Sequence, residues 1–133
     1  MNIKTIMTSI LLASACSGDG DDTDVLAPTF TEVRDDILIP SCGFSTCHGG
    51  GEGGLTLSAD DPGAAYSALV DVPSFVLPEE TLVIPGDAEN SYLVKKVEGA
   101  VGIDGDPMPA PFGIDETMAA DIRAWIDAGA KDD

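Results

Sequence analysis

The sequence predicts a mostly α-helical protein with long loops, and three observations lead to this fold class. The chain has 133 residues, the usual size of one domain. Four segments repeat their apolar residues at helical spacing, whereas signals for strands are weak. The 15 Gly and 9 Pro residues predict long loops between these segments, while 44% hydrophobic residues are too many for a fully disordered chain.

The first predicted helix covers residues 30–38. Thr29 or Thr31 can cap its N-terminus. Pro40 is expected to end it, because proline lacks the N–H group that a helix interior needs. The apolar residues that fall on one face of this helix are Phe30, Val33 and Ile37.

Three more helices are predicted along the chain. The second covers residues 62–70, and an irregular stretch over residues 73–85 follows it. Asp87 is expected to open the third helix. The last helix is expected to run from Asp115, its predicted cap, to about Ala128. The apolar residues predicted to face inward are Ala65, Leu69 and Val70 in the second helix, Tyr92, Leu93 and Val97 in the third, and Met118, Ile122, Trp125 and Ile126 in the last.

The N-terminus is typical of a targeting segment. Residues 1–15 hold one Lys, a short apolar run and small residues at the end, which is the pattern of a secretory signal peptide. Cys16 follows directly and resembles the cysteine of bacterial lipoproteins, which implies lipidation and a membrane anchor; the alternative is an ordinary signal peptide with a chance cysteine. Residues 16–27 would form the lipidated Cys and an acidic linker, and residues 28–131 the domain. We therefore expect an exported protein at the periplasm or cell surface, with Ser17 favouring the outer membrane if the host has one.

The charge of the chain excludes some classes of partner. It has 24 acidic and 6 basic residues, for a formal net charge of −18. Binding to nucleic acid needs clustered Lys and Arg, so nucleic acid is not an expected partner. A basic helix lying on a membrane surface is excluded for the same reason.

The single His follows a Cys directly, as Cys47-His48, and Cys42 precedes both. This is the attachment pattern of c-type haem, in which two thiols bond the haem vinyl groups and the His binds iron. Two residues usually separate the cysteines, but here there are four, which would place them about 140° apart on a regular helix. The segment must therefore bulge, and Gly43 supplies backbone freedom for this. The alternative is a Cys42–Cys47 disulfide beside an ordinary exposed His48, whereas structural zinc would need a fourth ligand.

The chain resembles the small cytochrome c domains of exported bacterial proteins, including the planctomycete-type group, over about residues 28–130. Beyond the haem pattern, the resemblance is carried by residues 83–93 (VIPGDAENSYL), by Met108-Pro109 and by residues 122–130 (IRAWIDAGA). It implies a mostly α, single-haem fold in which the first and last helices cross, with Phe30 or Ile37 meeting Trp125. It further implies covalent haem c on Cys42 and Cys47, with His48 as the proximal ligand of iron.

Two methionines in the predicted domain are candidates for the second axial ligand. Met118 belongs to the apolar stripe of the last helix, and is expected to pack in the core. Met108 lies between prolines in the Gly/Pro loop over residues 99–113, with no helical period to explain it. The resemblance implies that Met108 is the distal ligand; the alternative is a loop methionine resting on apolar surface.

These expectations favour an electron-transfer protein rather than an enzyme, because His/Met ligation leaves no open iron position. The acidic surface favours redox partners with basic docking surfaces. The basic residues are expected to be solvated rather than to meet the haem carboxylates; apart from Lys131 at the tail they are Arg34, Lys95, Lys96 and Arg123. The alternative function is a haem-free lipoprotein, stapled by the Cys42–Cys47 disulfide, that acts as a binding or structural module.

Overall fold

The structure is a computed structural model that describes residues 26–133. The predicted signal peptide 1–15, the lipidation site Cys16 and the linker up to residue 25 lie outside the described residues. Over the described part the fold is mostly helical, as predicted. It contains no strand there, only two isolated bridges, Val70 with Val83 and Pro73 with Thr81. None of the helices within residues 26–133 has the length and apolar character needed to cross a membrane.

The first helix consists of three consecutive segments: α1 (Phe30–Glu32), the π-helical η1 (Val33–Leu38) and α2 (Ile39–Cys42). Thr29 caps it as predicted: its hydroxyl accepts a 3.2 Å bond from the Glu32 N–H, and the Glu32 carboxylate accepts a 2.8 Å bond from the Thr29 N–H. The Phe30 side chain is buried at the start of this helix.

The prediction that Pro40 ends this helix is wrong, because the helix continues to Cys42. The Ile39 N–H donates to the Arg34 carbonyl, five residues back, so the turn before the proline is widened. A regular α-helix would bring the proline ring against the carbonyl four residues before it. In the π-helical turn the hydrogen bonds run to the carbonyl five residues back, so the helix continues past Pro40 and ends at Cys42.

The next helix, α3 (Pro62–Ser67), is shorter than predicted. Asp61 caps it by accepting a 3.0 Å bond from the Ala64 N–H. Leu69 lies beyond its end but is still fully buried, as predicted. The chain then turns so that the Asp71 N–H donates a 2.9 Å bond to the Val83 carbonyl. This contact to a distant segment ends the helix early.

The third predicted helix, α4 (Tyr92–Glu98), begins later than predicted, and Asp87 does not open it. The Asp87 carboxylate instead accepts a 3.2 Å bond from the Asn90 N–H and closes a turn. Ser91 is the N-cap residue; its hydroxyl accepts from the Ile84 N–H and donates to the Asp87 carbonyl, both at 2.8 Å. The long-range bond to Ile84 fixes the start of the helix.

The last helix, α5 (Glu116–Asp127), has the predicted bounds, with Asp115 as its N-cap and Ala128 as its C-cap. Its stripe is buried at Ile122, Trp125 and Ile126, and half-buried at Met118, which packs against the core.

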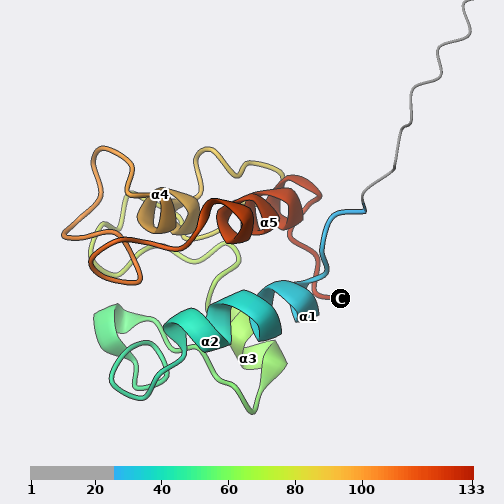
Figure 1. The fold of residues 1–133 in the computed structure, drawn as a ribbon, viewed down its shortest axis with the longest axis horizontal. Helices are drawn as coiled ribbons and strands as arrows, with labels where there is room; N and C mark the ends of the chain where they lie inside the picture. Colours follow the sequence, from blue (N-terminus) through green and yellow to red (C-terminus); the bar gives the residue numbers. More distant parts are fainter. Residues whose placement is uncertain (1–25) are drawn as a thin grey trace, which may run out of the picture.

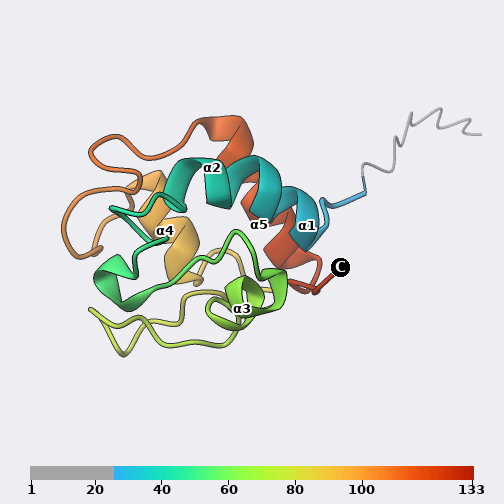
Figure 2. The same cartoon turned by 90° about the horizontal axis from the view of Figure 1, so that it is seen from below.

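The first helix and α5 pack together (Figure 1). The Phe30 and Trp125 rings meet at 5.3 Å between centroids, which confirms the predicted contact. The C-terminal residue Asp133 bonds the start of the first helix: its carbonyl accepts 3.0 Å from the Thr31 N–H. Figure 2 shows the C-terminus beside α1, at the far end of the domain from α4.

Candidate functional site

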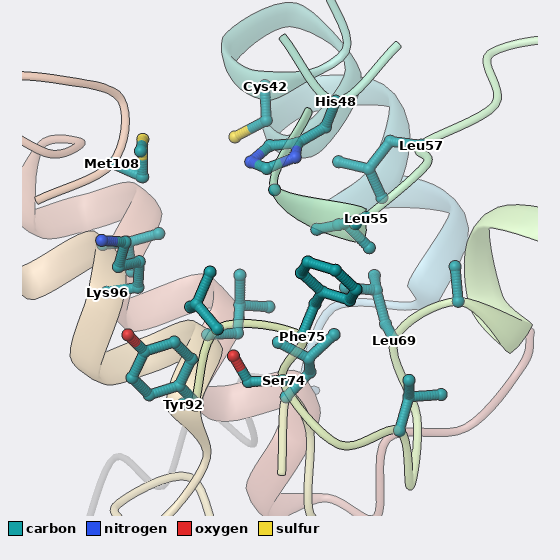
Figure 3. Close-up of a pocket in the computed structure, with 18 of the residues that line it drawn as sticks. Cys42, His48, Leu55, Leu57, Leu69, Ser74, Phe75, Tyr92, Lys96 and Met108 are labelled. Carbon is teal, nitrogen blue, oxygen red and sulfur yellow. The ribbon is translucent and has the colours of Figure 1, made fainter. Parts of the chain in front are cut away.

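A cavity of about 270 Å³ lies between the end of the first helix, the 3-10 turn η2 (Glu52–Gly54), α4 and two loops (Figure 3). Its walls are mainly apolar, which suits a ligand with a large apolar body. The apolar residues that line it include Leu38, Leu55, Leu57, Leu69, Leu82, Leu93 and Val97.

His48 lines this cavity, and the backbone around it fixes the orientation of its ring. The His48 Nδ1 lies 2.8 Å from the Glu52 carbonyl oxygen. A carbonyl only accepts, so Nδ1 carries the hydrogen and the neutral ring keeps its lone pair on Nε2, the form that ligates a metal. The His48 carbonyl also accepts a 2.8 Å bond from the Leu57 N–H. The half-buried ring points into the cavity (Figure 3).

The structure brings Cys42 to the cavity but leaves Cys47 outside it. Cys42 is the last residue of α2, is 8% exposed, and its sulfur points into the cavity (Figure 3). Cys47 is exposed on the loop that leads to His48 and does not line the cavity. Both are free thiols in the structure, so the alternative disulfide is not formed there. Burial, and secondarily the charge of Cys47, raises the pKa of the Cys42 thiol to about 11, so this thiol is neutral at pH 7.

Met108 reaches the same cavity from the 99–113 loop, where it is half-buried. Its N–H donates a 2.9 Å bond to the Lys96 carbonyl at the end of α4. The loop also approaches α4 closely at Gly113, whose φ is +81° and where a Cβ would lie 2.3 Å from the Val97 carbonyl oxygen. Helix α4 therefore positions Met108, and His48 and Met108 face one cavity from separate parts of the chain.

Tyr92 and Lys96 line the cavity one turn apart on α4. The Tyr92 hydroxyl accepts a 3.0 Å bond from the Asp104 N–H, and the Lys96 Nζ donates to the Asp104 carbonyl. Tyr92 is buried, as predicted, whereas Lys96, which was expected to be solvated, is half-buried. The spacing of four residues, which places Tyr92 and Lys96 on one face of a helix, is the sequence signal from which this pair could have been predicted.

The other basic side chains of the described domain helices form ion pairs away from the cavity lining. Lys95 pairs with Glu80 at 2.7 Å, and Arg34 pairs with Asp35 at 2.7 Å. Arg123 donates to both carboxylate oxygens of Glu98, at 2.5 and 2.7 Å, and to Glu89 at 3.1 Å.

No protein-family model, curated protein or solved structure matches the chain. Within residues 26–133, no group of three or more His, Cys, Asp or Glu side chains is placed to hold a metal ion.

Proposed function

We propose that this chain is an exported c-type cytochrome that carries electrons, with one haem held in the cavity between α2 and α4. One observation carries the proposal. The ring of His48, oriented by its bond to the Glu52 carbonyl, faces the same apolar cavity as Met108, and the thiol of Cys42, at the end of the first helix, points into this cavity too.

The cavity suits a porphyrin in its chemistry. Its apolar lining consists largely of leucine and valine, which would pack against an apolar ring. Phe75 lines the cavity yet is 76% exposed, and its neighbour Val76 is 44% exposed. Exposed large apolar groups at the rim of a cavity are typical of a binding site, and a bound flat apolar group would cover them.

His48 and Met108 would take the two axial positions. Haem iron exchanges one electron between its ferrous and ferric states, and His/Met ligation raises its potential. The Glu52 carbonyl accepts the His48 Nδ1–H, so the lone pair stays on Nε2, which would bind the iron with increased basicity. The attachment of Met108 to α4 limits the movement of the sulfur. If His48 and Met108 both bind the iron, no open position would be left for a substrate, which favours a carrier over an enzyme.

Covalent attachment would use Cys42 and Cys47. Each thioether forms when a thiol adds across a vinyl group: sulfur bonds one vinyl carbon and the hydrogen goes to the other, so no oxidant is consumed. Cys42 lines the cavity, which supports its part in this step. Cys47 lies outside and must turn inward from its loop.

The proposal also covers location and partners. Cys16 would carry lipid and anchor the exported domain at the periplasm or cell surface, in the outer membrane if the host has one. The net charge of −18 favours redox partners with basic docking surfaces and makes their association slower at high salt.

The proposal is tested by expressing the full chain with haem-maturation proteins and recording its visible spectrum and the haem stain of a denaturing gel. We expect the wild type to show both signals, and His48→Ala to lose the low-spin spectrum. Tyr66→Phe is a matched control, because the Tyr66 hydroxyl bonds the Ala130 carbonyl at 2.7 Å away from the cavity. A folded, colourless wild type would contradict the proposal and favour the haem-free module.

A further inference from the structure

Two polar side chains at one end of the cavity point to a binding site for carboxylate groups. Tyr92 and Lys96 are four residues apart on α4, so they lie on the same face of this helix. Both bond the backbone of Asp104, Tyr92 by accepting from its N–H and Lys96 by donating to its carbonyl. The phenol oxygen and the ammonium nitrogen therefore both lie within hydrogen-bond distance of one residue, Asp104, which also lines the cavity. Figure 3 shows Tyr92 and Lys96 on the same side of the cavity.

Each of these groups has hydrogens left to donate. The Tyr92 hydroxyl uses its oxygen to accept from Asp104, and within residues 26–133 its own hydrogen has no acceptor. Tyr92 is 3% exposed, so water does not readily supply one. The Lys96 ammonium has three hydrogens and donates one to the Asp104 carbonyl. The buried Tyr92 hydroxyl and the half-buried Lys96 ammonium favour an acceptor that carries negative charge.

The charged residues that line the cavity also favour an anion site at Lys96. Lys96 is the one Lys or Arg among the cavity-lining residues of the described chain, whereas Asp104 and Asp106 also line the cavity and repel an anion. Lys95 and Arg123 are occupied by carboxylates elsewhere. Because Lys96 and Tyr92 both bond the Asp104 backbone, an anionic group beside Lys96 would also lie near the Asp104 carboxylate, and the charge of Lys96 must offset this repulsion.

The position of these donors matches the shape of a haem. A haem carries its two vinyl groups on one edge and its two propionate carboxylates on the opposite edge. Figure 3 shows the Cys42 sulfur and the Tyr92 hydroxyl at separate ends of the cavity, with the buried Ser74 hydroxyl on the Tyr92 side. A haem attached at Cys42 would then extend its propionates toward α4.

We propose that Tyr92 and Lys96 bind the propionate groups of the haem and so set its orientation in the cavity. This inference rests on the proposed function. The test uses the full haem-loaded protein and resonance Raman spectra of the propionate vibrations, recorded in H₂O and in D₂O. Bands of propionates bound to exchangeable donors shift in D₂O, and this readout does not depend on electron-transfer activity.

Tyr92→Phe and Lys96→Met remove the two donors and keep most of the side-chain volume. We expect each variant to shift a propionate band and to reduce its D₂O sensitivity, and Lys96→Met to lower the reduction potential, because a cation near the iron disfavours the ferric state. Lys95→Met and Tyr66→Phe are the matched controls, since Lys95 pairs with Glu80 and the Tyr66 hydroxyl bonds the Ala130 carbonyl. Both controls should leave the propionate bands unchanged.

The outcomes separate this inference from the proposed function. A wild type without haem would overturn both. Haem-loaded Tyr92→Phe and Lys96→Met proteins whose propionate bands match the wild type would overturn the propionate assignment alone. Because Tyr92→Phe removes a single oxygen and keeps the buried ring, its spectrum decides the matter even if Lys96→Met does not accumulate.

Discussion

Truncating each of the two methionines of the domain tests the ligand assignment in depth. Met108→Ala removes a half-buried side chain on a loop that bonds α4 through the backbone, so the fold should persist. Met118→Ala removes a half-buried side chain that packs on the core from α5. Fully buried Met→Ala truncations cost roughly 2–5 kcal/mol. Because Met118 is not fully buried, Met118→Ala should cost about 2 kcal/mol or less, and Met108→Ala a similar or smaller amount.

The two variants should therefore differ in spectrum rather than in stability. The assay is the long-wavelength charge-transfer band of Met-bound ferric haem, together with binding of an added ligand such as imidazole. Met108→Ala should lose the band, bind the added ligand and have a lower potential, because a thioether ligand raises the potential. Met118→Ala should keep the band and bind nothing new. If Met108→Ala keeps the band, or if Met118→Ala loses it, the assignment of Met108 as the iron ligand and Met118 as a packing residue is refuted.

Four other substitutions test what the structure implies. Cys42→Ala and Cys47→Ala should each leave one thioether, and Cys42→Ala should lower the haem stain more, because only this thiol lines the cavity; equal staining of the two variants would contradict this. The hydrogen bond from Arg123 holds the pKa of Glu98 below its usual value, so the pair stabilises the fold above the unfolded pKa of about 4.3 and this contribution is lost as the pH falls through the lower folded value. Arg123→Met should thus remove less than about 1 kcal/mol at pH 7 and less still near pH 3, as measured by urea unfolding; an equal loss at both pH values would argue against the linkage. Gly113→Ala should destabilise the protein by more than about 1 kcal/mol, because its φ is +81° and the added Cβ meets a backbone oxygen; unchanged thermal unfolding would rule this out.

Helices whose signals are local were predictable from the sequence. In α5 the Asp115 cap and the stripe through Trp125 are both properties of neighbouring residues, and the bounds agree with the structure. The prediction that Pro40 ends the first helix is wrong because a π-helical turn before the proline lets the helix continue. No pattern in the residues of this turn predicts the π-helical conformation. The prediction that Asp87 opens α4 is wrong because the start of this helix depends on the hydrogen bond from the Ile84 N–H to the Ser91 hydroxyl, across a turn.

In the candidate site, too, the residue types were predictable from the sequence but the main-chain contacts were not. The Cys-His pattern and the proline-flanked methionine singled out His48, Cys42 and Met108, and the structure places these three at one cavity. Their roles in binding haem stay predictions. The Glu52 carbonyl that orients His48, and the Asp104 backbone that bonds Tyr92, are main-chain groups with no signature in the sequence. Their positions follow from how the loops fold, which residue types alone do not determine.

The central claim is that this chain holds haem covalently, and intact-mass measurement of the purified mature protein under denaturing conditions tests it most directly. The account predicts a mass equal to that of the mature chain, with its lipid, plus one haem. Cys42→Ala,Cys47→Ala in combination should show the chain without haem. A wild-type mass with no haem added, and two protons below that of the reduced chain, would contradict the account and identify the disulfide-linked module instead.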